Sequence, residues 1–167
     1  RNQPDTQRAF HSKGHACLRG ELVLVDRPAY FQEGIFAPEY EGRPWKLWAR
    51  FSNGVGWTQK DTELDIRGLA LKILEVPGNK FMSDETQTQD MIMITSPVGF
   101  GRDAREFMDF AHANSQKAGV VGTAKTGSYA ATHPTVRTPI VRGIVSTLKG
   151  ISTLAQMQYW SGTPYRM

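Results

Sequence analysis

Cysteine is nearly absent from this sequence, since Cys17 is the only one among 167 residues. A single cysteine cannot form an intrachain disulfide, so the fold has to be stabilised by packing. Long hydrophobic runs are absent too, and none approaches the ~20 residues that a membrane-spanning helix requires. We therefore expect a soluble domain without a membrane span. The sequence leaves open whether it is cytoplasmic, periplasmic or secreted.

The sequence also lacks a run of basic residues. Lysine and arginine total 20, and aspartate and glutamate total 16, which gives a formal net charge of +4. The charges are interspersed, and aromatic residues do not alternate with a Lys/Arg cluster, so we do not expect nucleic-acid binding. With 40% hydrophobic positions, the chain suits one domain with a full core, because compact domains commonly have ~100–150 residues.

Strand signals dominate the first hundred residues. Apolar and polar residues alternate in Trp45–Ser52, and turn residues follow in Asn53–Gly56. The strands expected from such patterns are His15–Val25, Trp45–Ser52, Leu69–Leu74 and Met91–Ile94. Because no helix is expected between them, the sequence favours an antiparallel sheet or barrel.

Helical signals replace them in the second part of the chain. Asp103, followed three residues later by Glu106, forms a capping box. It predicts a helix with Phe107, Phe110 and Ala111 on one face. We expect a long loop over residues 118–137 and then a helix from Thr138 to Leu154, where apolar residues recur at helical spacing.

The four histidines are the residues most suited to catalysis, but their spacing alone gives them no common site. They are His11, His15, His112 and His133. None forms a zinc pair on an expected helix, and there is no cysteine cluster. Spacing alone therefore favours surface or hydrogen-bonded core histidines.

Several segments together change this interpretation, because the chain resembles the haem catalase superfamily in five places and in the family's order. The segments are RAFHSKG (8–14), ARFSNG (49–54), DTELDIRGLALKIL (61–74), SPVGFGRDAREFMDFAHANSQK (96–117) and QYWSGTPY (158–165). The resemblance covers nearly the whole chain and is strongest to the short, divergent catalase-related proteins.

The resemblance implies an α+β fold, a catalase-like antiparallel β-barrel with added helices. The 167 residues would form the N-terminal half of it, a partial haem domain that is strand-rich over residues 8–97 and helical over 103–157. The aromatic residues up to Tyr165 predict that the packed structure continues. A further segment or a second chain would complete the domain, and we expect a homo-oligomer.

The resemblance also implies a cofactor, haem b with ferric iron, and a role for each matching residue. His11 would be the distal acid/base, with Ser52 as its hydrogen-bond partner. Arg8 and Arg50 would pair with the haem propionates, which need cations when they are buried. Three aromatic residues would line the cofactor: Phe10, Phe107 and Phe110. Asp65 and Ile94 would lie in the substrate channel, whereas we interpret Arg67 and Gly68 as structural.

Two departures from the family pattern matter for function. Counting back from Pro97, the distal asparagine of catalases falls on Ile94, which can neither donate nor accept a hydrogen bond. Gly54 and Gly99 replace bulkier residues and would widen the distal pocket, whereas Phe10 is larger than the usual valine. No tyrosine has the arginine-rich context of the catalase iron ligand, so a proximal tyrosine is expected in a C-terminal segment.

The resulting hypothesis is a haem-dependent oxidoreductase that reacts with hydrogen peroxide or organic hydroperoxides. The loss of the asparagine favours a peroxidase over a fast catalase. One alternative is rearrangement of a fatty-acid hydroperoxide, as in allene-oxide-synthase-like relatives. Another is a non-enzymatic haem-binding or interaction protein on a catalase scaffold.

Overall fold

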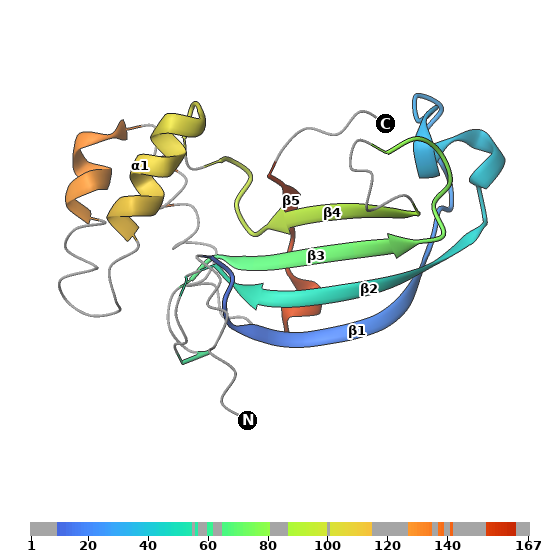
Figure 1. The fold of residues 1–167 in the computed structure, drawn as a ribbon, viewed down its shortest axis with the longest axis horizontal. Coiled ribbons are helices and arrows are strands. Elements are labelled where there is room, and N and C mark those ends of the chain that lie inside the picture. Colours follow the sequence, from blue (N-terminus) through green and yellow to red (C-terminus); the bar gives the residue numbers. More distant parts are fainter. Residues whose placement is uncertain are drawn as a thin grey trace.

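The computed structural model describes residues 10–54, 56, 60–61, 65–80, 87–99, 101–114, 127–134, 137–138, 141 and 153–162. These residues contain an antiparallel sheet in which the strands follow one another in sequence order (Figure 1). The strands are β1 (Gly14–Val23), β2 (Pro44–Asn53), β3 (Arg67–Leu74), β4 (Thr88–Ile94) and β5 (Trp160–Ser161). The four strands predicted from the sequence are thus confirmed, and closure into a barrel stays a prediction.

One face of the sheet carries the hydrophobic core. Trp45 and Leu47 alternate with exposed residues along β2, and Leu47 pairs directly with Ile73 of β3. Side chains of directly paired residues project to the same face, so these three meet there. Together with Ile35 and Val76 they form the buried core cluster.

Two short 3-10 helices cover the core at one end of the sheet. They are η1 (Gly34–Phe36) and η2 (Pro38–Tyr40), both in the connection from β1 to β2 (Figure 1). Ile35 of η1 enters the core, and the ring of Tyr40 meets that of Trp45 edge-on at 5.2 Å. This end of the sheet is therefore the packed end.

Helix α1 (Ala104–Asn114) follows the sheet, as the capping box predicts. The Asp103 carboxylate accepts a hydrogen bond from the backbone N–H of Glu106 at 2.9 Å. The Glu106 carboxylate accepts from the N–H of Arg102 at 2.6 Å rather than from that of Asp103. Only the first half of the predicted box is therefore formed, and Glu106 caps the preceding turn instead.

The expected loop over residues 118–137 is wrong in part, because residues 127–132 are helical and lie beside α1 (Figure 1). Ala130 is buried, and the Tyr129 ring lies 6.4 Å from that of Phe110 in α1. These few apolar contacts are enough to order a segment that composition alone assigned to a loop. Residues 115–126 lie outside the described residues.

Most of the helix expected over residues 138–154 also lies outside the described residues. Its last position, Leu154, belongs instead to the 3-10 helix η3 (Leu154–Gln156). Thr153 is extended, with φ −156°, and its side chain accepts a hydrogen bond from the N–H of Ala155. A continuous helix through Leu154 is therefore wrong. No helix in the described part of the chain is both long and apolar enough to cross a membrane.

Candidate active site

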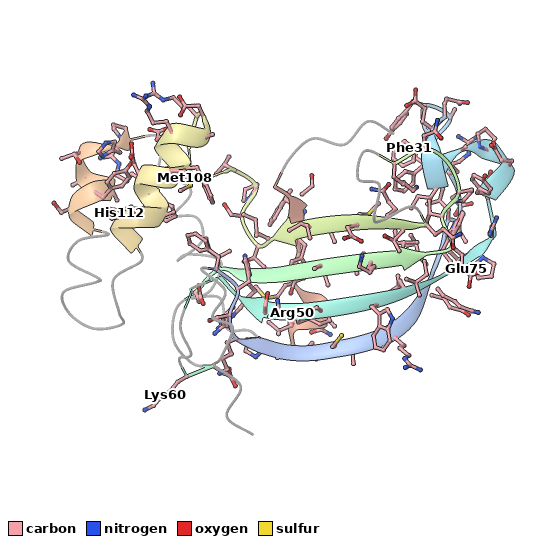
Figure 2. The ribbon with its side chains drawn as sticks, in the orientation of Figure 1. Phe31, Arg50, Lys60, Glu75, Met108 and His112 are labelled. Carbon is pink, nitrogen blue, oxygen red and sulfur yellow. The ribbon has the colours of Figure 1, made fainter. Side chains whose placement is uncertain are left out.

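The candidate residues gather at the end of the sheet that faces α1. Antiparallel pairing brings the beginning of β1 and β3 to the end of β2 and β4 (Figure 1). Figure 2 shows Arg50 on β2 toward this end, with Phe31 and Glu75 at the opposite, packed end. The candidate site and the core cluster are therefore at different ends of the sheet.

The backbone of His11 is held in a conformation that is unusual for a residue with a side chain. Its φ is +54°, in the left-handed region, which costs a non-glycine residue about 1–3 kcal/mol. The N–H of His11 donates to the carbonyl of Gly54 at 3.0 Å. Its own carbonyl accepts from Nη2 of Arg50 at 2.8 Å. These two hydrogen bonds fix the turn that brings the His11 side chain to the sheet.

The His11 ring makes a hydrogen bond with the end of β2. Its Nδ1 lies 3.0 Å from Oγ of Ser52, and Ser52 is only 3% exposed. A buried hydroxyl at one ring nitrogen fixes the orientation of the imidazole and constrains its tautomer. The two residues predicted as catalytic are therefore in contact.

Gly68 forms the floor beneath this pair. It pairs with Ser52 on one side and with Ile94 on the other. A Cβ on Gly68 would lie 2.6 Å from both Nδ1 and Cε1 of His11 and 2.8 Å from Oγ of Ser52. The imidazole thus occupies the place where a side chain of residue 68 would be. The interpretation of Gly68 as simply structural missed this contact, for which the sequence offers only the glycine in a strand interior.

Ile94 lies in the same row of paired residues. Because paired residues share a face, its side chain projects on the side of Ser52 and His11. Ile92, two residues earlier, projects on the same face and is 55% exposed. The predicted substitution of an asparagine by Ile94 therefore falls beside the candidate acid/base.

The Asp65 side chain is bound to the backbone of Gly54, the residue that contacts His11. The side chain is 5% exposed, and its carboxylate accepts from the N–H of Gly54 at 3.1 Å and lies 4.0 Å from Nη1 of Arg67. The carbonyl of Gly54 in turn accepts a hydrogen bond from the N–H of His11. The Asp65 carboxylate therefore stabilises the Gly54 backbone to which His11 is bound. The position of Asp65 in a substrate channel stays a prediction.

Gly54 does not widen the pocket as expected. A Cβ there would lie 2.9 Å from the carbonyl oxygen of Ile66 and 3.2 Å from Oδ1 of Asp65. The space beside Gly54 is filled by the neighbouring loop, so the expected enlargement at this position is wrong. At Gly99 the nearest atom of the described residues is the carbonyl oxygen of Gly101, 4.0 Å from where a Cβ would lie, so these residues leave room there.

The predicted aromatic residues divide into two groups. Phe10 precedes His11 in the chain, its ring lies 6.0 Å from that of Phe107 in α1, and Phe107 is 41% exposed. Phe110 is buried and contacts Tyr129 within the helical part. The structure therefore brings Phe107 against Phe10, the neighbour of His11, whereas Phe110 faces the helical segment that carries Tyr129. Arg8 lies outside the described residues.

His15 belongs to a polar cluster on the other face, together with Lys13, Asn53, Asp61 and Arg67. The Nε2 of His15 is hydrogen-bonded to Oδ1 of Asn53, and its Nδ1 lies 3.4 Å from Oδ1 of Asp61. Nζ of Lys13 donates to the same oxygen at 2.5 Å, and this hydrogen bond lowers the pKa of Asp61 below its ordinary value. The cluster ties the start of β1 to the loop before β3.

The remaining histidines are away from this site. His112 is exposed on α1 (Figure 2). The ring of His133 stacks on that of Tyr129 at 3.9 Å. Among the four histidines, His11 is therefore the candidate acid/base.

The described tyrosines have contacts that do not bring them beside His11. Tyr30 is 74% exposed, and Tyr40 packs on Trp45 in the core. Tyr129 packs on Phe110, and Tyr159 lies 6.2 Å from Phe51, whose side chain is on the core face. Among the described residues there is no cluster of three His, Cys, Asp or Glu side chains that could hold a metal ion.

The residues at the site fit the distal side of a haem. An imidazole lies against a strand backbone in the space that a Cβ would fill, its Nδ1 is hydrogen-bonded to Ser52, and the preceding residue, Phe10, pairs with Phe107. The contacts with Ser52 and Gly68 therefore fix the orientation of the His11 ring. The site contains a candidate acid/base, and none of the described tyrosines has a contact beside it.

Comparisons with known proteins agree with the resemblance. The family model for catalase matches residues 5–157. A catalase from Staphylococcus saprophyticus subsp. saprophyticus is 32% identical over 108 residues, which cover 64% of this chain and 20% of that protein. A peroxisomal catalase from Toxoplasma gondii is 32% identical over 111 residues, covering 66% and 20%. The chain spans about a fifth of the length of these curated relatives.

Solved structures support the same fold. A bacterial catalase superposes with a TM-score of 0.61 and 24% identity, over 81% of this chain and 24% of that one. A fungal catalase gives a TM-score of 0.53 and 24% identity, over 72% of this chain and 22% of that one.

Proposed function

The chain belongs to the catalase family, and we propose that it supplies the distal side of a haem site that reacts with hydrogen peroxide or an organic hydroperoxide. The observation that supports this most is the contact of His11 with Ser52 and Gly68. It presents an oriented imidazole, the side chain whose ordinary pKa is closest to neutral pH. That group suits a reaction in which a proton is both removed and returned.

His11 moves the proton in this proposal. When Oγ of Ser52 accepts from Nδ1–H, Nε2 is the basic atom of the ring. Nε2 takes the proton from one peroxide oxygen and returns it to the other, which leaves as water or as an alcohol. The haem, when bound, supplies the electrons that cleave the O–O bond. The hydrogen bonds of the His11 backbone keep the ring in place during both transfers.

Several residues would hold the cofactor, haem b. Arg50 and Arg8 would pair with its propionates, and Arg50 would then connect the propionates to the carbonyl of His11. Phe10 and Phe107 would pack on the macrocycle, and Phe110 would support α1 behind them. Asp65 is proposed to border the substrate channel through the Gly54 turn.

We propose that the iron ligand, a tyrosinate, comes from polypeptide beyond these residues. The contacts of the described tyrosines, on the core face and in the helical part, support this. A further segment or a second chain would complete the domain, in a homo-oligomer.

Ile94 supports a peroxidase rather than a fast catalase. To oxidise a second peroxide molecule, the site has to polarise that molecule through a hydrogen bond too. Ile94, beside His11, has no group that can donate or accept one. Rearrangement of a fatty-acid hydroperoxide is the main alternative enzyme activity, because an apolar distal side suits an apolar substrate. A non-enzymatic haem-binding or interaction protein is the other alternative.

An optical spectrum and an intact mass of the native protein test the proposal. We expect a Soret band, oxidation of a reducing dye by peroxide, and little oxygen evolution. Fast oxygen evolution would indicate a catalase, and consumption of a fatty-acid hydroperoxide without a reductant would indicate the rearrangement. A Soret band without any of these reactions would leave the haem-binding protein, and a folded native protein without haem would contradict the proposal.

Replacing Ile94 with asparagine should raise oxygen evolution from hydrogen peroxide more than it raises dye oxidation. The amide restores a hydrogen-bonding group beside His11, and a hydrogen bond to a developing charge is worth about 1.5–3 kcal/mol, or roughly tenfold or more in rate. Ile92→Asn is the matched control, because Ile92 is on the same face of β4 but is exposed. Equal changes in both activities, or in both variants, would show that Ile94 does not limit the second peroxide.

A further inference from the structure

The His11 ring lies directly against the backbone of Gly68, in the space that a side chain at this position would fill. A Cβ on Gly68 would be 2.6 Å from two ring atoms of His11, closer than carbon atoms approach without displacement. Gly68 is not among the described glycines with positive φ, so its backbone does not require glycine. The close approach of the imidazole, together with Oγ of Ser52 at 2.8 Å, accounts for the glycine.

Neither partner can retreat easily. Gly68 is in β3, a strand paired on both sides, through Ser52 and Ile94. The adjacent Arg67 is fixed as well, since its N–H donates to Oγ1 of Thr95 and its carbonyl accepts from the N–H of Thr95, both at 3.0 Å. On the other side, the His11 backbone is held by Gly54 and Arg50. A side chain at position 68 would therefore have to rotate the imidazole.

We propose that Gly68 is a positioning residue, whose missing side chain sets the location of the His11 ring and keeps its Nδ1 within hydrogen-bonding distance of Ser52. This inference rests on the function proposed above, since the reaction needs His11 in that position. A methyl group at residue 68 would break the His11–Ser52 hydrogen bond and displace Nε2. A displacement of about 1 Å at a reacting group can reduce a rate by about 10²-fold.

The test is a double-mutant cycle in the full-length haem protein, with His11→Ala, Gly68→Ala and both together. Gly68→Ala should lower the peroxide reaction rate by about 10²-fold in the wild-type background. It should change the rate by less than about twofold once His11 is alanine, because residues that act through one group are not additive. Gly20→Ala is the matched control, since a Cβ there would lie an ordinary 3.7 Å from Leu47.

The melting temperature of the same four proteins gives a readout independent of activity. Gly68→Ala should lower it clearly more in the wild-type background than in the His11→Ala background, where the ring is gone and only Oγ of Ser52, 2.8 Å from the new Cβ, is still that close. An equal loss in both backgrounds would overturn the proposed role of Gly68. If His11→Ala leaves the peroxide reaction unchanged while the melting temperatures follow the expected pattern, the steric role stands and the proposed function fails. If Gly68→Ala alone does not fold, the proposal still predicts that the double variant folds, because the His11 ring is then absent.

Discussion

Replacing His11 with alanine should lower the rate of the reaction with hydrogen peroxide by about 10²–10⁴-fold, which is the usual contribution of a positioned acid/base. Alanine cannot take a proton from one oxygen or return it to the other. Haem should stay bound, because the proposed iron ligand is elsewhere and the cations proposed for its propionates are unchanged. Stopped-flow mixing with peroxide measures the rate, and the Soret absorbance measures haem content.

His112→Ala is the control for this experiment, because His112 is a histidine exposed on α1 (Figure 2). Its reaction rate should equal that of the wild type. A normal rate in His11→Ala would remove His11 from the mechanism. Loss of haem from His11→Ala alone would instead indicate that His11 contributes to binding.

The strands were predictable because their signals are local. Alternation in Trp45–Ser52 reflects one face against the core and one face away from it, and the buried Trp45 and Leu47 follow that pattern. The start of α1 was equally predictable, since the Asp103 cap depends on residues three positions apart. The helical segment at 127–132 has no such local signal, because it depends on the contact between Tyr129 and Phe110.

The site was predictable only as far as motif positions allowed. The resemblance selected His11 and Ser52, which are 41 residues apart and which the structure brings into contact. It could not show that the space at Gly68 is filled by the imidazole, or that Asp65 and Ile66 fill the space at Gly54. Both facts follow from the pairing of distant strands and from a turn with positive φ at His11. Neither the strand pairing nor the positive φ of His11 can be predicted from the residue types alone.

Replacing Trp45 with alanine should have the largest effect on stability. Trp45 is 1% exposed and packs with Leu47 and Ile73, with the Tyr40 ring at 5.2 Å and the Arg43 guanidinium 4.1 Å from its own ring. Removing a buried tryptophan leaves a cavity and typically costs about 3–5 kcal/mol. Urea denaturation of the full-length protein, followed by far-UV circular dichroism, measures the loss.

Trp48→Ala is the matched control for Trp45→Ala, because Trp48 is on the same strand but on the opposite face. It is 36% exposed, and the Arg19 guanidinium lies 4.5 Å from the centre of its ring. An exposed cation–π contact is worth only about 0.5–1 kcal/mol, so its loss should be several times smaller. Equal losses for the two variants would mean that the core does not lie on the Trp45 face. Trp48 lies on the same face of β2 as Ser52, so a large loss for Trp48→Ala alone would show that this face is covered by the rest of the protein.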